Sequence, residues 1–321
     1  MEVKLKIFRY DPDKETKGSY TEYPIDVDEN ATVLDGLMEV RSSHDSSLSF
    51  KGSCRTGLCG DCSVQVNGKG AVACRTTLAK ALKKGKDGVV SVDPLYPVKK
   101  IKDLIYDQND FLLEKYKAMK PWVVANLSQG TREDEVSEST ITELQRVMSC
   151  TMCGLCDQGC LVIAVDEQYV GPAALNKVYR VVMDPRDSSK REKLEFASGA
   201  RKVWDCTHCF EATAHCPKDV RPTESIFELR DMAIKNGIGH GRPVNHHKSF
   251  AASVKNDGWL DETRLAIETE GWLNLPGLLK LGPVGLRAFM KRKAPLPYFL
   301  HKKRKGADAI KRIFNKWERE S

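Results

Sequence analysis

Eleven cysteines dominate this 321-residue chain, and they fall into three tight groups. The first group reads C-x4-C-x2-C with a more distant fourth member: Cys54, Cys59, Cys62 and Cys74. The second is a C-x2-C-x2-C-x3-C run: Cys150, Cys153, Cys156 and Cys160. The third is a near copy of that run with one member missing: Cys206, Cys209 and Cys216. These spacings are typical of plant-type [2Fe–2S] and bacterial-type [4Fe–4S] ligation, so we expect the chain to fold around iron–sulfur clusters.

The second and third groups are expected to exchange one ligand. In two-cluster ferredoxins the last cysteine of each run binds the other cluster. This rule predicts a [4Fe–4S] centre held by four thiolates: Cys150, Cys153, Cys156 and Cys216. The third site is then left with three: Cys160, Cys206 and Cys209. A [3Fe–4S] centre needs only these three, whereas a [4Fe–4S] centre would need solvent or another side chain within sequence reach: Asp205, His208 or Glu211.

Two other uses of cysteine fit the pattern less well. Disulfides are disfavoured because eleven is an odd number and because the N-terminus reads as a strand without a secretory signal, which predicts a cytoplasmic protein. Zinc is the stronger alternative, since paired C-x2-C motifs can build tetrathiolate sites. It does not explain the C-x4-C-x2-C group or the run that ends in C-x3-C.

Residues 1–105 are expected to form a small sheet-rich domain. Alternating apolar residues predict strands at Val3–Phe8 and Tyr20–Val27, and Thr32 with Asp35 predicts the capped start of a helix. A hairpin should follow at Ser63–Val66, because the next residues, Asn-Gly, tolerate the positive φ of a type I′ turn. The Gly-rich and Ser-rich stretch Phe50–Cys62 is expected to be a loop that wraps a cluster closely.

The rest of the chain reads as helical. After a predicted linker at residues 106–139, Thr140 and Glu143 should cap a helix running into Cys150, and helices are expected at Pro172–Met183 and Ser225–Lys235. A cysteine run, then helices, then a second cysteine run is the order found in a bacterial-type two-cluster ferredoxin with an insertion. We therefore expect such a domain at residues 140–240. The expected fold class is therefore α+β, with a C-terminal extension at residues 241–321.

That extension carries most of the positive charge. From Leu281 to Ser321 twelve Lys and Arg face three Asp and Glu, a net of +9 against +7 for the whole chain. No helix-turn-helix, zinc-finger or aromatic-basic motif accompanies this charge, so we expect no nucleic-acid partner. A stripe at helical spacing, Ile310, Ile313, Phe314 and Trp317, predicts a basic amphipathic helix that either rests on anionic lipid or, more commonly, packs on the protein or a subunit. No stretch approaches the ~18 apolar residues of a membrane span, so any membrane contact should be peripheral.

The order of these motifs resembles the iron–sulfur subunit of succinate dehydrogenase and fumarate reductase. Six segments within residues 1–240 carry the resemblance: Gly52–Gly60, Asp93–Leu95, Val98–Asp107, Val170–Leu175, Tyr179–Asp187 and Cys216–Lys218. The resemblance implies a β-grasp N-terminal domain and a chain without catalytic residues. In that family an FAD-containing subunit oxidises succinate to fumarate, and this subunit relays electrons through a [2Fe–2S], a [4Fe–4S] and a third cluster towards quinone. It also implies a peripheral position at the cytoplasmic face of the membrane.

Four positions depart from the family pattern. Ala212 stands where a third-group cysteine is usual, and Cys209 fills a place whose loss usually accompanies the trinuclear form, which slightly favours a tetranuclear third cluster. Leu161, Val165 and Thr207 occupy the places of a Pro, a Trp and a His near the family's quinone pocket, and the two aliphatic side chains cannot hydrogen-bond a quinone carbonyl.

These departures resemble a less common branch, whose membrane-side partner is a cysteine-rich subunit similar to heterodisulfide reductase rather than a pair of haem-bearing anchors. The segment from His246, including Pro295-Leu296-Pro297, also resembles the small ferredoxin subunit of heterodisulfide reductase. The alternative function is therefore a ferredoxin-type subunit of a soluble thiol-dependent fumarate reductase or heterodisulfide-reductase-like system. The histidines lack metal spacing, and we assign them no role: His208, His215, His240, His246 and His247.

Overall fold

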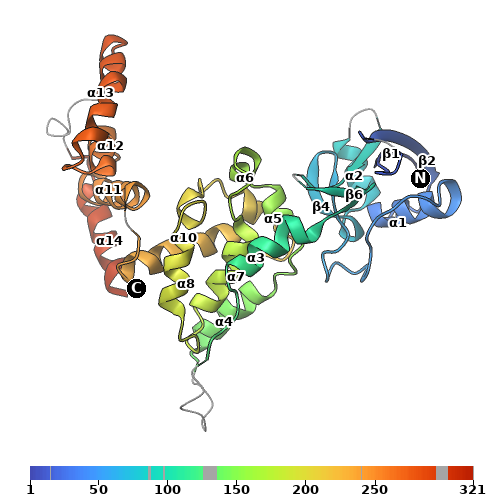
Figure 1. Ribbon diagram of the computed structural model, residues 1–321, viewed down its shortest axis with the longest axis horizontal. Helices are drawn as coiled ribbons and strands as arrows, with labels where there is room; N and C mark the ends of the chain where they lie inside the picture. Colours follow the sequence, from blue (N-terminus) through green and yellow to red (C-terminus); the bar gives the residue numbers. More distant parts are fainter. Residues whose placement is uncertain are drawn as a thin grey trace, which may run out of the picture. The chain divides into compact units, whose positions relative to one another are not determined.

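The computed structural model describes residues 1–14, 16–85, 88–96, 98–125, 136–239, 241–293 and 303–320. The chain divides into two compact units, Met1–Ala233 and Ile234–Ser321 (Figure 1). Part of the predicted linker, His240 and the segment Pro295-Leu296-Pro297 lie outside the described residues. Within the described part, no helix is long and apolar enough to cross a membrane.

A mixed five-stranded sheet opens the first unit, in the order β2-β1-β5-β3-β4. The strands are β1 Glu2–Arg9, β2 Ser19–Asp26, β3 Ser63–Val66, β4 Lys69–Val72 and β5 Val89–Asp93. Strand β1 runs antiparallel to β2 and parallel to β5, while β3 runs antiparallel to both β4 and β5. Side chains alternate between the two faces of a strand, so Val3, Leu5 and Ile7 of β1 enter the core.

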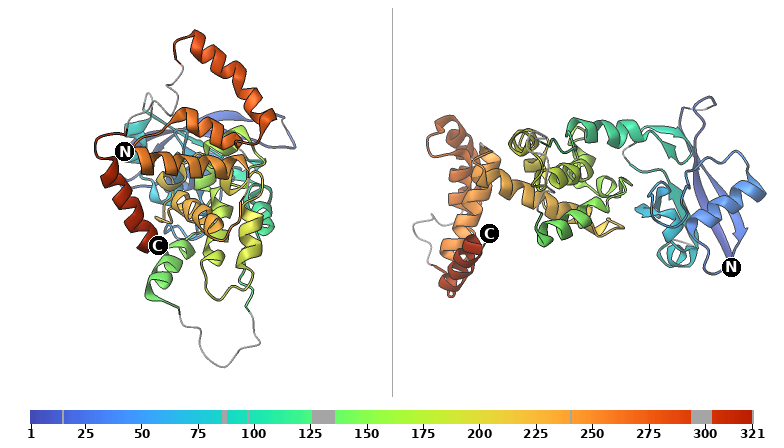
Figure 2. Two further views of the ribbon diagram at one scale, coloured as in Figure 1. Left: turned by 90° about the vertical axis from the view of Figure 1, so that its left-hand side faces the viewer. Right: turned by 90° about the horizontal axis from the view of Figure 1, so that it is seen from below.

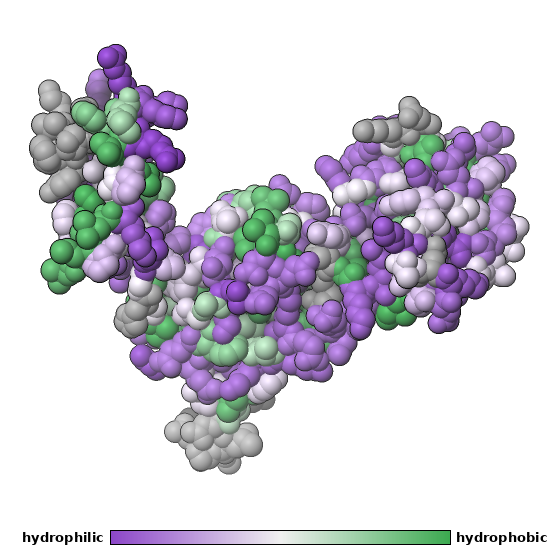
Figure 3. All heavy atoms as spheres, turned by 45° about the horizontal axis from the view of Figure 1, so that its top comes forward, coloured by the Kyte–Doolittle hydropathy of each residue, from purple (hydrophilic) through white to green (hydrophobic). Residues whose placement is uncertain are grey.

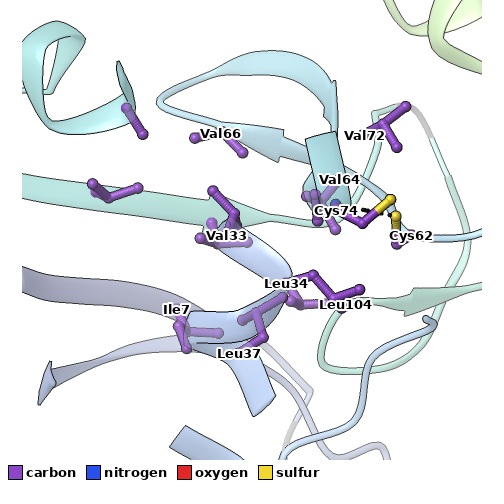
Figure 4. Close-up of a cluster of buried hydrophobic side chains, with 14 of the residues drawn as sticks. Ile7, Val33, Leu34, Leu37, Cys62, Val64, Val66, Val72, Cys74 and Leu104 are labelled. Carbon is purple, nitrogen blue, oxygen red and sulfur yellow. Dashed lines mark hydrogen bonds between the residues drawn. The ribbon is translucent and has the colours of Figure 1, made fainter. Parts of the chain in front are cut away.

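Helix α1, Val33–Glu39, lies across one face of this sheet (Figure 2). Its start is fixed by a complete capping box between Thr32 and Asp35, which confirms the sequence prediction. Leu34 and Leu37 of this helix pack with Ile7 and other strand residues (Figure 4). The same cluster reaches the first cysteine group, because two of its thiols lie at the edge of the core, as Figure 4 shows: Cys62 and Cys74.

The β3–β4 hairpin is also confirmed. Asn67 and Gly68 adopt positive φ of 51° and 76°, as a type I′ turn requires. Shorter elements complete the sheet-rich part: the π-helix η1 Val40–His44, η2 Ala73–Arg75, α2 Leu78–Lys84, β6 Lys100–Lys102 and β7 Ile105–Tyr106. The residues between η1 and β3 form the irregular loop expected around the first cysteines.

Helices make up the rest of the first unit. They are α4 Glu138–Met148, α5 Leu155–Gln158, α6 Leu161–Val165, α7 Pro172–Val182, α8 Lys190–Ala197, η5 Val203–Asp205, α9 Glu211–Ala214 and α10 Pro222–Lys235. Helix α7 is almost wholly buried at the centre, and α3, α4, α5 and α8 contact it. A mixed sheet followed by helices confirms the α+β class.

Two local predictions need revision. The start of α4 was expected at Thr140, but Ser137 is its N-cap: the Ser137 hydroxyl accepts the Thr140 N–H, and Glu143 instead binds Arg146 and the Tyr179 hydroxyl. The segment expected to be a linker contains η3 Asn109–Leu113 and α3 Glu114–Ala118. Helix α3 is fastened to the fold because Lys115 donates to the carbonyls of Glu167 and Tyr169.

The described residues of the second unit that follow α10 form these helices: α11 Arg242–Asp257, α12 Glu262–Glu270, α13 Leu275–Met290 and α14 Ala307–Glu320. Helix α11 packs against α12 and α14, and Lys255 of α11 forms an ion pair with Glu318 of α14 at 2.7 Å. The predicted amphipathic C-terminal helix is thus confirmed as α14. It packs partly on the chain's own body, although Ile313 and Trp317 remain mostly exposed.

Candidate iron–sulfur centres

Three cysteines of the first group lie in a loop and the fourth, Cys74, lies in η2; backbone N–H groups of both segments point at sulfur. Cys54 Sγ accepts from the backbone N–H of Cys59 at 3.3 Å and of Thr56 at 3.5 Å. Asp61 N–H donates to Cys59 Sγ at 3.4 Å, and Cys74 N–H donates to Cys62 Sγ, also at 3.4 Å. Such donors stabilise thiolate, the form that binds iron.

Electrostatics of these four thiols follow from burial and from the N–H donors. The N–H groups of Cys59 and Thr56 lower the pKa of the Cys54 thiol to about 5. Burial raises the pKa of Cys62 to about 12, and the charges of Cys74 and Cys59 add to this effect. The structure therefore brings the four cysteines of this group together. Their surroundings favour the thiolate form of Cys54, whereas the thiolate form of Cys62 would need a nearby cation to stabilise it.

Glycines let this loop approach its neighbours. Gly57 and Gly60 have φ of 75° and 70°, a region that side chains other than glycine rarely adopt. A Cβ at Gly60 would lie 2.5 Å from the Cβ of Cys153 and 2.7 Å from Thr151 Oγ1. The loop of the first group therefore lies directly against the loop of the second.

Four cysteines from two groups line one cavity, together with Gly154, Ala173 and Asn176: Cys150, Cys153, Cys156 and Cys216. Positive φ at Met152 and Gly154 turns the chain before α5, so that successive cysteines face the same space. Val220 N–H donates to Cys216 Sγ at 3.3 Å. The structure thus places Cys216 with the first three cysteines of the second run, the set named by the ligand-exchange rule.

Burial is the main cause of the raised pKa of these thiols. It raises the pKa of Cys153 and raises the pKa of Cys156 well above its ordinary value. Thiolates in such a place require a bound cation for compensation. Within the described residues, no three Cys, His, Asp or Glu side chains are grouped closely enough to hold a single metal ion, as a tetrathiolate zinc site requires. The set of four thiols fits an iron–sulfur cluster.

The remaining three cysteines line a second cavity, together with Tyr169, Thr207 and Ala212: Cys160, Cys206 and Cys209. Burial raises the pKa of Cys160 to about 11 and also raises that of Cys206. The buried Tyr169 hydroxyl has no hydrogen-bond acceptor of standard geometry in the described structure, but it lies near enough to Cys206 to oppose the rise in that thiol's pKa. A thiolate or sulfide in the cavity would be the acceptor that this hydroxyl needs.

The proposed fourth ligands of this cavity are engaged elsewhere. Asp205 accepts the backbone N–H of Lys202, and a carboxylate oxygen of Glu211 lies 3.5 Å from His215 Nδ1. His208 contacts the Arg230 guanidinium and packs edge-on against Phe227, with ring centroids 4.2 Å apart. None of the three is among the residues that line the cavity in the described structure, and the methyl group of Ala212 is.

Two charged side chains near the cavities were not found from the sequence. Arg230 of α10 is 4% exposed and donates to the carbonyls of Val203 and Cys206, each at 2.8 Å. Burial lowers the pKa of this guanidinium. A signal existed, because Arg230 lies within the predicted helix Ser225–Lys235, directly after Leu229 and four residues after Ile226.

The second overlooked residue is Asp157 of α5, between Cys156 of the first cavity and Cys160 of the second. Its Oδ1 accepts the Ala173 N–H at 2.9 Å, and complete burial raises its pKa to about 6. Gly171, with φ of 89°, leaves it room, since a Cβ there would lie 2.8 Å from Oδ1. Nothing in the local sequence distinguishes this aspartate, because its burial depends on α7 packing over it.

The three residues at the positions of the family's quinone pocket do not all lie in one place in the structure. Thr207 lines the second cavity. Leu161 and Val165 lie on α6 and are 58% and 90% exposed. Together they leave an apolar surface on α6, which follows directly after Cys160.

Comparison with known proteins agrees with this arrangement. Residues 4–113 match the family model for a 2Fe-2S iron-sulfur cluster binding domain, and residues 146–220 match that for a 4Fe-4S dicluster domain. The 8-methylmenaquinol:fumarate reductase iron-sulfur subunit of Wolinella succinogenes is 31% identical over 273 residues, covering 84% of this chain and 85% of that protein. The fumarate reductase iron-sulfur subunit of Mycobacterium tuberculosis is 33% identical over 239 residues, covering 74% of this chain and 94% of its own length.

A solved structure, the Mycobacterium smegmatis Sdh1 complex in the apo form, contains a chain of similar fold. The TM-score is 0.65 at 23% identity, over 73% of this chain and 96% of the other. Fold and sequence relatives therefore converge on one assignment. The chain belongs to the family of succinate dehydrogenase and fumarate reductase iron–sulfur subunits, and its function is electron transfer within an oxidoreductase complex of that kind.

Proposed function

We propose that the cysteines hold three clusters in three separate sets. A [2Fe–2S] cluster is held by the first group, Cys54, Cys59, Cys62 and Cys74. A [4Fe–4S] cluster is held by Cys150, Cys153, Cys156 and Cys216, and a third cluster by Cys160, Cys206 and Cys209. The observation that carries this proposal is the pair of cavities, each lined by cysteines from both the second and the third group.

The clusters, when bound, supply the one-electron carriers, and the protein supplies their surroundings. Backbone N–H groups donate to Cys54, Cys59, Cys62 and Cys216, which favours the negative charge that accumulates on reduction. In the second and third sets Cys156 is buried and most of the other thiols are partly buried, whereas Cys209 is exposed. Because Gly60 allows the first loop to contact Cys153, the first and second sets are close neighbours.

For the third cluster we propose the [3Fe–4S] form. Three thiols line its cavity, Ala212 stands at the remaining wall, and the side chains considered as a fourth ligand are engaged elsewhere. This reverses the slight preference for four irons that the position of Cys209 suggested. An EPR spectrum of the oxidised protein tests it: a full-occupancy [3Fe–4S] signal is expected, and its absence with four irons at this site would contradict the proposal.

In the complex we place this subunit between an FAD-containing dehydrogenase subunit and a membrane-side partner, peripherally at the cytoplasmic face. The apolar surface of Leu161 and Val165 beside the third set supports docking of a partner there. These side chains offer no hydrogen bond to a quinone, which supports a cysteine-rich partner that carries the quinone site itself. The name of the Wolinella relative, an 8-methylmenaquinol:fumarate reductase subunit, supports a quinol at that end of the complex.

The exchange of one ligand between the second and third cysteine groups gives the sharpest test of this cluster assignment. Cys216→Ser and Cys160→Ser are each made in the full chain, and EPR spectra are recorded in the oxidised and reduced states. We expect Cys216→Ser to alter the [4Fe–4S] signal and spare the third cluster, and Cys160→Ser to do the reverse, so each variant controls for the other. If each substitution damages the cluster of its own sequence run, the assignment is wrong.

The electron donor that the complex accepts distinguishes the proposed function from the alternative, a soluble thiol-dependent system. Fumarate reduction by the purified complex is measured with a quinol analogue and with a dithiol at equal reducing potential. Activity with the quinol alone supports the membrane-associated complex. Activity with the dithiol alone would favour the heterodisulfide-reductase-like alternative.

A further inference from the structure

Helix α13 exposes an unusual amount of apolar side chain for a helix outside a bilayer. Six large residues are each 60% or more exposed: Leu275, Leu279, Val284, Leu286, Phe289 and Met290. At roughly 100° per residue, all of them except Val284 fall within a sector of about 100° on one side of the helix, and Val284 lies on the opposite side. Trp272 and Leu273, just before the helix, are 56% and 97% exposed. The result is one continuous apolar stripe, Trp272–Met290.

Within the residues that the structure describes, the body of the second unit does not account for this stripe. Helix α13 meets α12 near its first turn, where the Asn274 side chain donates to the Glu270 carbonyl at 3.2 Å and Gly277 is buried. Beyond that turn its large side chains face outwards. Figure 3 shows broad hydrophobic surface on the C-terminal unit beside strongly hydrophilic surface.

Charge along this segment has a single sign. Between Gly271 and Lys293 there are five Lys and Arg and no Asp or Glu. Three of them, Lys280, Arg287 and Lys291, recur at i, i+7 and i+11 and so form a row on one side of the helix, next to the apolar stripe. Helices α11 and α14 differ, because their charges pair with one another, as in Lys255 with Glu318.

We propose that α13 binds in the plane of an anionic membrane surface. The apolar stripe would enter the boundary between headgroups and acyl chains, and the cationic row would meet the lipid phosphates. Trp272 suits the interface, where an indole keeps its ring in the apolar layer and its N–H in the polar one. Sixteen residues give about 24 Å of helix, shorter than the ~30 Å hydrocarbon core, so the helix lies along the surface instead of crossing it.

A protein partner is the less favoured occupant. Protein interfaces are depleted of lysine and of charge at their centres, whereas here lysine and arginine accompany the apolar stripe from Lys280 to its end. The proposal deepens the peripheral localisation suggested above and names the element that provides it. It does not rest on the cluster ligands.

Vesicle flotation of the full, cluster-loaded chain tests this proposal. Vesicles of phosphatidylcholine alone are compared with vesicles containing about a third phosphatidylglycerol. We expect binding to the anionic vesicles, at least tenfold weaker binding to the neutral ones, and release by high salt. Equal binding to both, or no binding to either, would overturn the proposal.

Variants identify the element. Leu279→Ser with Phe289→Ser removes part of the stripe, and Lys280→Gln with Arg287→Gln removes part of the row; each pair should weaken binding at least tenfold. Ile313→Ser on α14, whose side chain is 68% exposed, is the matched control and should leave binding unchanged.

If only the control variant, Ile313→Ser, loses binding to the vesicles, then α14 and not α13 is the membrane-binding helix. If the α13 variants float normally but no longer associate with a partner subunit, the stripe is a protein interface and the lipid proposal fails. The visible cluster spectrum, measured on the same samples, reports separately on the cluster assignment and on folding.

Discussion

Arg230 places a buried positive charge beside the third cysteine set, held by the carbonyls of Val203 and Cys206. A cation in a medium of low dielectric constant favours the more negative, reduced state of a neighbouring cluster. We predict that Arg230→Gln lowers the reduction potential of the third cluster by on the order of 50 mV, equivalent to about 1 kcal/mol for one electron.

Potentiometric titration followed by EPR measures this shift. Arg230→Lys keeps the charge but not the planar donors, so it should restore most of the potential. A potential unchanged in the Gln variant, with the third cluster intact, would show that the guanidinium is only structural.

Ala212 gives a second prediction at the residue scale. Because its methyl group lines the third cavity, Ala212→Cys adds a fourth thiol there. We expect the [3Fe–4S] signal of the oxidised protein to disappear and iron content to rise by about one atom per chain. Ala212→Ser, with a weaker ligand of similar size, should keep the trinuclear signal; loss of the signal in both variants would point to disruption and not to ligation.

The role of a residue could be predicted where the spacing of residues in the sequence determines it. The cysteine sets follow from C-x2-C geometry, so the sequence indicates which thiols share a cavity, including the exchange of Cys216. Arg230 and Asp157 were missed because their importance comes from burial by segments far away in the chain. The fourth-ligand candidates were close in sequence, but their contacts with Lys202, His215 and Arg230 could be seen only in the fold.

At the scale of elements, the contact between the first two cysteine loops is the critical one. A side chain at Gly60 would collide with Cys153, whereas a side chain at Gly68 meets nothing within 4 Å; both residues have positive φ. We predict that Gly60→Ala costs about 1–3 kcal/mol more stability than Gly68→Ala, through steric overlap alone. Urea unfolding of the two variants measures the difference, and equal losses would mean that the loops do not touch.

Elements with strong local signals were well predicted. The Thr32–Asp35 capping box and the Asn67-Gly68 turn need only neighbouring residues. The start of α4 was misplaced because two residues, Ser137 and Thr140, offer equivalent hydroxyls one turn apart, and Ser137 is the cap in the fold. Helix α3 was missed because its position depends on Lys115 reaching carbonyls about fifty residues away.

At the scale of the whole molecule, the two units have different surfaces and different tasks. The first unit, Met1–Ala233, contains all eleven cysteines. The second contains none and carries the exposed apolar helix α13. Electron transfer and attachment to a surface are thus assigned to separate parts of one chain.

The central claim is that this chain holds three distinct clusters. Iron analysis combined with EPR at a series of fixed potentials, on the intact purified chain, tests it most directly. The account predicts about nine iron atoms per chain and three one-electron centres with separate potentials, one of them a [3Fe–4S] signal in the oxidised state. Stoichiometric zinc, or only one or two iron–sulfur signals in a fully loaded protein, would contradict it.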